Sequence, residues 1–113
     1  MRQERPRILC ISESPVQLKE ISSAIASLGY EAILASTPER ALACCIGTQV
    51  AAVVLGTESL TEMGFSAAQS IRMARPDLPI LLLEQGHNGD VPHGISAVAA
   101  SVSTMAQKLV ALL

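Results

Sequence analysis

The chain has 113 residues, enough for one domain with a single core and too few for two. Half of the residues are apolar and two are aromatic, so the core must be built from aliphatic side chains. Eight basic and ten acidic residues give a net charge of −2, which argues against nucleic-acid binding. No apolar run approaches the roughly 20 residues that span a bilayer, and no signal-peptide core is present. Because three cysteines do not make a disulfide framework, we expect a cytoplasmic protein with reduced thiols.

The first structural unit is a strand followed by a capped helix. Residues 1–6 are expected to form an N-terminal tail, and the apolar run 7–11 is the first strand. Ser14 precedes Pro15, which is the usual arrangement at the start of a helix, and Gln17 completes a predicted capping box with Ser14. Apolar residues then recur at helical spacing until Gly29, which ends the helix.

The second unit repeats this plan. Residues 31–35 are predicted to form a strand, and Thr37 and Pro38 start a helix that ends at Gly47. Cys44 and Cys45 lie inside this helix. We expect one of them to be buried and the other half-exposed, since partner ligands at metal-binding spacing are absent from the chain.

The third unit contains the position of greatest functional interest. Residues 51–55 are apolar on both faces, which is typical of a central parallel strand, and the run stops at Gly56. Ligands and catalytic groups gather at the carboxyl ends of such strands, and here that position carries a glycine. A helix over residues 65–74 and a buried strand over 79–83 are predicted to follow.

The C-terminal part is less regular. Residues 84–94 are predicted to form a loop, which holds His87 and His93; two such residues without a third ligand do not make a metal site. A weak fifth strand is expected within 95–102 and a last helix over 104–113. Strands that alternate with capped helices indicate an α/β fold with a parallel sheet.

Three segments, in this order, resemble the receiver domain of response regulators. They are residues 8–15, residues 53–56 with Gly64 eight positions later, and residues 75–83. The resemblance covers residues 7–113 as a single receiver-like domain. It implies a flavodoxin-like, doubly wound sheet of five parallel strands in the order 2-1-3-4-5. The fourth helix of the family would fall between Glu84 and Gly94, where the chain is too short, so we expect this helix to be shortened or missing.

The resemblance also implies where the family's functional residues would lie. Carried over one at a time, its acidic pair falls on Ser12 and Glu13, its phosphoacceptor aspartate on Gly56, its hydroxyl residue on Glu84 and its lysine near Ser101. Phosphoryl transfer requires a carboxylate nucleophile and Mg²⁺, which is usually held by one or two carboxylates. Glycine supplies no nucleophile, and Glu13 is alone unless Glu58 or Glu84 turns inward. The resemblance therefore predicts a degenerate pseudo-receiver that is not an enzyme and has no metal or cofactor.

Two functions remain open for such a domain. The first is a signalling module that acts through protein–protein contacts with a kinase-like protein, an output domain or a second copy of itself. The second is a flavodoxin-like domain that binds a small molecule or a phosphate-bearing ligand at Ser12, Ser14 and the start of the first helix. Glu84 is either a solvent-facing loop residue or a fixed negative charge, and Glu13 is either a relic or a carboxylate held near the helix start.

Loss of the fourth helix would leave apolar side chains uncovered, which is typical of an interface. We expect a homodimer or a partner complex around the fourth strand, the fifth strand and the last helix; the alternative is a monomer in which the 84–94 loop covers the gap. The candidate interface residues are Leu81, Leu83, Val98, Met105 and Leu109.

Overall fold

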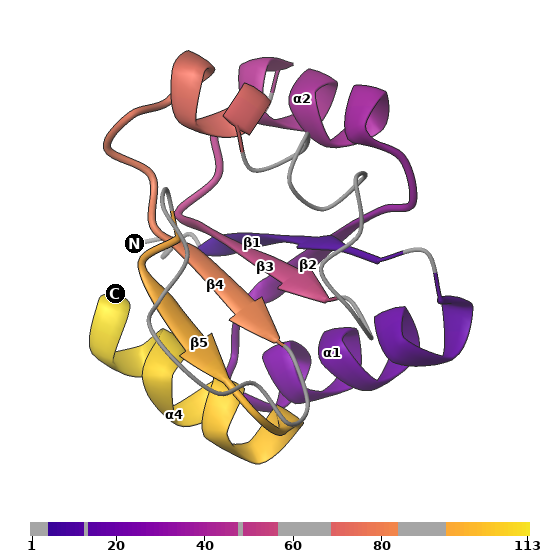
Figure 1. Cartoon of the computed structure of the whole chain (residues 1–113). Coiled ribbons are helices and arrows are strands. Elements are labelled where there is room, and N and C mark those ends of the chain that lie inside the picture. Colours follow the sequence, from indigo (N-terminus) through magenta and orange to yellow (C-terminus); the bar gives the residue numbers. More distant parts are fainter. Residues whose placement is uncertain (1–4, 13, 48, 57–68, 84–94) are drawn as a thin grey trace, which may run out of the picture.

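The fold is a parallel five-stranded sheet with helices on both faces (Figure 1). The computed structural model describes residues 5–12, 14–47, 49–56, 69–83 and 95–113. The strand order is β2-β1-β3-β4-β5, as expected for the doubly wound fold. The strands are β1 (Arg7–Ile11), β2 (Glu31–Ala35), β3 (Ala52–Gly56), β4 (Ile80–Leu83) and β5 (Ala97–Ala99).

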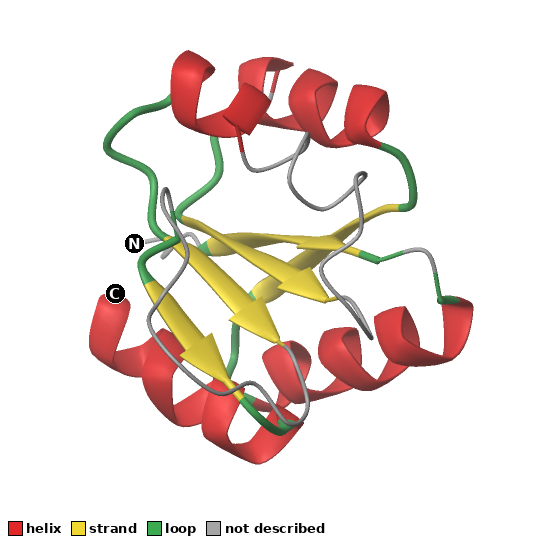
Figure 2. Cartoon of the chain, viewed as in Figure 1, coloured by secondary structure: helices red, strands yellow, loops and turns green. Residues whose placement is uncertain are grey.

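The helices form two outer layers (Figure 2). On one side of the sheet lie α1 (Pro15–Ser27) and α4 (Val102–Leu112), and on the other lie α2 (Pro38–Gly47) and the helical residues 69–74. None of the helices in these described parts of the chain is both long and apolar enough to cross a membrane. The expected loss of the fourth helix concerns residues 84–94, which lie outside the described residues.

The predicted N-cap of α1 and its predicted C-terminal stop are confirmed. Ser14 is the N-cap residue, Pro15 is the first helical residue, and the Ser14 side chain accepts a hydrogen bond from the Gln17 N–H. At the other end, Gly29 has φ +85°, a left-handed conformation that a residue with a Cβ adopts only with strain. The helix therefore stops where the sequence indicates.

Several element boundaries differ from the predicted ones by one or two residues. β3 runs one residue later, from Ala52 to Gly56, β4 begins at Ile80, and α4 begins at Val102 because Ser101 provides its N-cap. β5 is three residues long and lies within the predicted range 95–102. The first part of the predicted third helix, residues 65–68, is not described. Its last part, residues 69–74, is helical, and Arg72 Nη1 donates to the carbonyls of Pro76 (2.8 Å) and Leu78 (2.9 Å). These bonds fix the turn that leads into β4.

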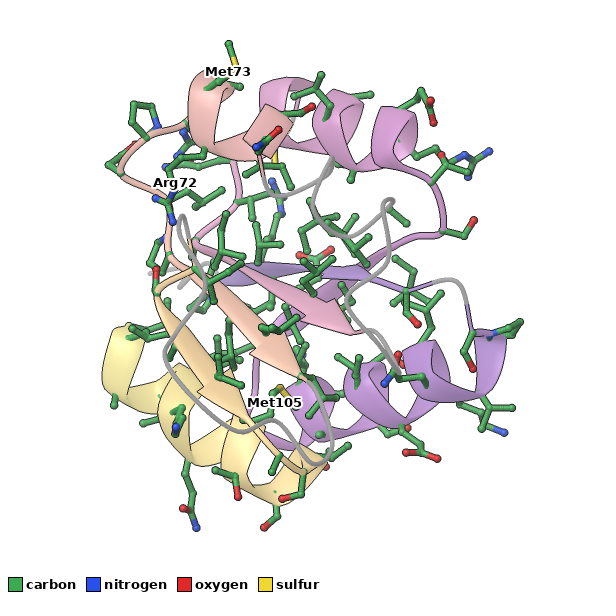
Figure 3. The ribbon with its side chains drawn as sticks, viewed as in Figure 1. Arg72, Met73 and Met105 are labelled. Atoms are coloured by element: carbon green, nitrogen blue, oxygen red, sulfur yellow. The ribbon has the colours of Figure 1, made fainter. Side chains whose placement is uncertain are left out.

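Alternate residues of the central strands pack into two separate cores. The core beneath α2 and residues 69–74 contains Leu9, Ile11, Val53, Leu55, Ile80 and Leu82. The core beneath α1 and α4 contains Ile8, Cys10, Val54, Leu81, Leu83, Met105 and Leu109. In Figure 3, Met105 extends from α4 toward the sheet, whereas Met73 points away from it. The separation follows from the period of two along a strand.

This division corrects the expected interface. Leu81, Met105 and Leu109 are fully buried and Leu83 is 5% exposed, so these four side chains lie in the core between the sheet and α1 and α4. Leu81 and Leu83 are covered because the odd-numbered residues of β4 face α1 and α4, and Met105 and Leu109 are the residues of α4 that meet them in this core. Val98 is half-buried and packs against the other core. The expectation of uncovered apolar side chains is wrong for the four buried residues.

Candidate functional site

The candidate site lies where the carboxyl ends of β1 and β3 meet the start of α1. Ser12 directly follows β1, and its N–H donates to the Ala35 carbonyl of β2 (3.3 Å), which continues the sheet by one residue. Its side chain is 1% exposed, and among the described residues Ser12 is the only polar residue that is buried. A buried hydroxyl requires hydrogen-bond partners, because an unsatisfied one destabilises the fold by about 1–3 kcal/mol.

Three hydrogen bonds join Ser12, Ser14 and Gln17. The Ser12 hydroxyl donates to Gln17 Oε1 (2.7 Å), the Ser14 N–H donates to Ser12 Oγ (3.1 Å), and the Gln17 N–H donates to Ser14 Oγ (3.2 Å). We call this ring the Ser–Ser–Gln clasp. It closes the turn from β1 into α1, and it leaves neither hydroxyl oxygen of the clasp without a partner.

The clasp modifies the predicted capping box. Ser14 forms its half of the box by accepting from the Gln17 N–H. In the reciprocal half, Ser12 replaces Gln17 as the acceptor of the Ser14 N–H. The Gln17 side chain instead reaches the Ser12 hydroxyl, because that buried donor has no access to water and needs a nearby acceptor.

Gly56 is the last residue of β3 and faces α1. It has the same parity along the strand as Ala52 and Val54, which both belong to the core beneath α1 and α4. A Cβ atom at this position would lie 2.7 Å from Ile21 Cδ1 and 2.9 Å from Gln17 Oε1, both closer than van der Waals contact. The space for a side chain at position 56 is therefore filled by two side chains of α1.

The structure brings together only some of the predicted site residues. Ser12 and Gly56 meet at the same end of the sheet, joined through Gln17. Glu13 and Glu84 lie outside the described residues, as do Glu58, His87 and His93. Within the described part of the chain, no three or more histidine, cysteine, aspartate or glutamate side chains are grouped as a metal site would require.

The placement of Ser101 differs from the expectation for the family lysine. Ser101 is exposed and lies two residues beyond the end of β5, where its Oγ accepts from the Thr104 N–H (3.2 Å) as the N-cap of α4. Lys108, on α4, places its ammonium group near β5, where Nζ donates a hydrogen bond to the Val98 carbonyl. Ser101 thus has a structural role at the start of α4.

The side-chain oxygens of the described residues at this site do not form a suitable set of ligands for Mg²⁺. This ion favours several hard oxygen ligands, with carboxylates among them. The side-chain oxygens here are two hydroxyls and one amide, all neutral and all engaged in the clasp. Ser12, Ser14 and Gln17 form hydrogen bonds with one another, and none of these three residues offers a charged group to a cation or to a phosphoryl oxygen.

Cys10 and Cys45 are structural rather than reactive. Burial raises the pKa of the Cys10 thiol to about 12, and burial likewise raises the pKa of Cys45, with smaller and opposing effects of Arg75 and Cys44. As predicted, Cys45 is buried and Cys44 is half-buried. Because the thiolate is the reactive form, Cys10 and Cys45 are poor nucleophiles in the folded chain.

Sequence reasoning missed the two residues that fill the site, Gln17 and Ile21. Both were recognised only as part of the first helix, one in its cap and one on its apolar face. The available signal was the glycine itself, because a glycine at the end of a buried strand often marks the close approach of another group. Residues 17 and 21 are one helical turn apart, so they share the face of α1 that meets Gly56.

The comparisons with known proteins identify the fold. No protein-family model matches the chain, and no curated protein matches it in sequence. Among solved structures it is similar to the response regulator TrrA of Thermotoga maritima in complex with Mg²⁺ and beryllium fluoride. Identity is 24%, the TM-score is 0.83, and the match covers 96% of this chain and 99% of TrrA.

Two other structures give the same result. Chemotaxis protein CheY4 of Vibrio cholerae is 19% identical with a TM-score of 0.81, covering 96% of this chain and 99% of CheY4. A chain in the complex of histidine kinase ThkA with TrrA is 22% identical with a TM-score of 0.80, covering 96% and 98%. The chain therefore has the fold of response-regulator receiver domains.

Proposed function

We propose that the chain is a receiver-like signal-transduction module that performs no phosphoryl transfer at position 56 and acts through protein–protein contacts. The observation that carries this proposal is the filled space at Gly56. The residue at the carboxyl end of β3 has no side chain, and Gln17 Oε1 and Ile21 Cδ1 stand within 3 Å of where a Cβ would be.

The chemistry of receivers supports the loss of transfer. An acyl phosphate forms on a carboxylate, and a divalent cation neutralises the charge on the phosphoryl oxygens. Position 56 supplies no carboxylate, and the neighbouring oxygens of Ser12, Ser14 and Gln17 are neutral and occupied by one another. A domain without this chemistry retains its surface as the means of passing a signal.

The similarity to TrrA supports a protein partner. TrrA has been seen in complex with histidine kinase ThkA, and this chain has the same fold over nearly its whole length. A kinase-like protein, an output domain or a second copy of the chain would each make the contact through exposed residues, because the central strands β3 and β4 and the helix sides that face the sheet are buried.

The alternative, a domain that binds a phosphate-bearing ligand, is disfavoured by the clasp. It would use the hydroxyls of Ser12 and Ser14 at the start of α1. Ser12 is 1% exposed and donates to Gln17 Oε1, and the Ser14 hydroxyl accepts from the Gln17 N–H. A ligand could accept a hydrogen bond from the Ser12 hydroxyl only after the bond to Gln17 Oε1 had been broken.

Treatment with acetyl phosphate, or with beryllium fluoride and Mg²⁺, tests the proposal. We expect no phosphoryl adduct by intact mass spectrometry and no change in the amide NMR resonances of Ser12 and Gly56. TrrA treated in parallel is the positive control, because its complex with Mg²⁺ and beryllium fluoride is known. A saturable, Mg²⁺-dependent shift of Ser12, Glu13 and Gly56 would contradict the proposal.

A further inference from the structure

Gln17 has two roles at the candidate site, and together they indicate a device specific to this chain. We propose that Gln17 is a plug: from α1 it fills the volume left by the missing side chain at position 56, and through the Ser–Ser–Gln clasp it locks the start of α1 against the carboxyl end of β3. The inference rests on the proposed function, since it describes how a receiver fold is held together at a position that no longer carries its acceptor.

The first step is the shared position of one oxygen atom. Gln17 Oε1 accepts from the Ser12 hydroxyl at 2.7 Å and also lies 2.9 Å from the Cβ position of residue 56. The Gln17 Cδ atom is 3.1 Å from the same point, so two atoms of the amide group lie close to the glycine. Ile21, which is fully buried one turn further along α1, lies closer still, with its Cδ1 2.7 Å from the same point.

The second step is the dependence of each clasp bond on the others. The Ser12 hydroxyl is buried and its acceptor is Gln17, while its oxygen in turn receives the Ser14 N–H at the start of α1. If Gln17 moved aside, the Ser12 hydroxyl would lose its acceptor in a place that water does not reach. Gln17 is therefore a positioning residue, and its displacement by a side chain at position 56 would break its hydrogen bond to Ser12.

The third step is the consequence for position 56. A Cβ there would lie within 3 Å of both Ile21 Cδ1 and Gln17 Oε1, so a side chain at position 56 must displace both. The part of this cost that comes from Gln17 couples residues 17 and 56 energetically. The same coupling means that Gly56→Asp alone does not restore an acceptor site, because the carboxylate would collide with the amide of Gln17. Room for it requires that Gln17 be shortened and that Ile21 Cδ1 also move aside.

A double-mutant cycle on unfolding equilibria tests the plug. We expect Gly56→Ala to raise the unfolding equilibrium constant, and we expect this effect to shrink by roughly 3- to 100-fold when Gln17→Ala is also present. Gln107→Ala is the matched control, because Gln107 is an exposed glutamine on α4 and its removal should leave the effect of Gly56→Ala unchanged. Additivity of Gly56→Ala and Gln17→Ala within about twofold would overturn the proposal.

A second variant at residue 17 separates the effect of the side chain's volume from the effect of its hydrogen bond to Ser12, and it does not open a cavity. Gln17→Met keeps the length of the side chain but accepts no strong hydrogen bond. We expect Gly56→Ala to remain as unfavourable in Gln17→Met as in the native chain, while amide hydrogen exchange at Ser14 becomes about tenfold faster or more. Unchanged exchange at Ser14 in both Gln17→Met and Gln17→Ala would show that the clasp does not depend on Gln17.

These measurements distinguish the plug from the proposed function. The cycle and the exchange experiment follow unfolding and local opening, and they involve no phosphoryl donor. Absent coupling together with absent phosphorylation would overturn the plug alone. Strong coupling together with phosphorylation of the native chain would overturn the proposed function alone.

Discussion

Ser12 shows how much one hydroxyl contributes at this site. Its oxygen accepts a hydrogen bond from the Ser14 N–H, and its O–H donates a hydrogen bond to Gln17 Oε1. One hydroxyl therefore satisfies two partners at the end of β1. Because Ser12 is 1% exposed, water is not available to replace it.

Replacement of this hydroxyl is the first test at the residue scale. We expect Ser12→Ala to lower the free energy of unfolding by about 1–3 kcal/mol, since it removes two part-buried hydrogen bonds, one from the Ser14 N–H and one to the Gln17 amide oxygen. Urea denaturation measures the change. The control is Ser27→Ala, because Ser27 is exposed at the end of α1 and its loss should change stability by less than about 0.5 kcal/mol. Equal effects of the two substitutions would contradict the buried role.

The buried thiol of Cys10 leads to a second prediction at this scale, which concerns the dependence of the free energy of unfolding on pH. Cys10 ionises near pH 9.0 when unfolded and only at about 12 when folded, so the folded chain binds more protons between these values. The free energy of unfolding should therefore fall as pH rises above about 9, with a slope of up to about 1.4 kcal/mol per pH unit from this thiol. Cys45, whose pKa is also raised, adds to the same trend.

Denaturation of variants at pH values from about 8 to about 10.5 checks this dependence. Cys10→Ala should flatten the fall in stability relative to the native chain. The prediction fails if Cys10→Ala keeps the native slope.

At the scale of single elements, the starts of α1 and α4 are built in the same way. In each helix a serine accepts a hydrogen bond from the N–H three residues later: Ser14 from Gln17 and Ser101 from Thr104. The difference lies in the surroundings, because the α1 cap belongs to the clasp near Gly56, whereas Ser101 is exposed.

Ser101 is accordingly expected to behave as a helix cap. Ser101→Ala should lower the free energy of unfolding by about 1 kcal/mol, and Ser101→Asp should retain most of the stability because aspartate also caps well. Ser103→Ala, at an exposed position inside α4, is the control and should have little effect. Thermal or urea denaturation distinguishes these variants, and a loss with Ser101→Asp as large as with Ser101→Ala would contradict the capping role.

At the scale of the whole molecule, two cores of aliphatic side chains hold the sheet between its helices. Leu81 is central to the core beneath α1 and α4 and has no exposed surface. Leu34, on the edge strand β2, is 48% exposed. The two leucines therefore differ in environment while sharing the same chemistry.

This contrast separates a core role from an interface role. Leu81→Ala should lower the free energy of unfolding by about 2–5 kcal/mol, while Leu34→Ala should have a much smaller effect. Sedimentation equilibrium on the folded variants reports association separately. If Leu81→Ala weakened self-association and left the unfolding free energy of the monomer unchanged, the assignment of Leu81 to the core would be wrong.

The sequence by itself determined the order and type of the elements, the capping of α1 by Ser14, the stop at Gly29 and the glycine at the end of β3. These features are local: apolar periodicity, a capping residue and a breaker act within a few positions of the chain. Only the tertiary structure decided which face Leu81 and Leu83 occupy, since a strand that is apolar on both sides carries no record of which side meets α1 and α4. It also decided that Gln17 meets Ser12 and Gly56, because that contact depends on how closely α1 packs on β3, which no local pattern encodes.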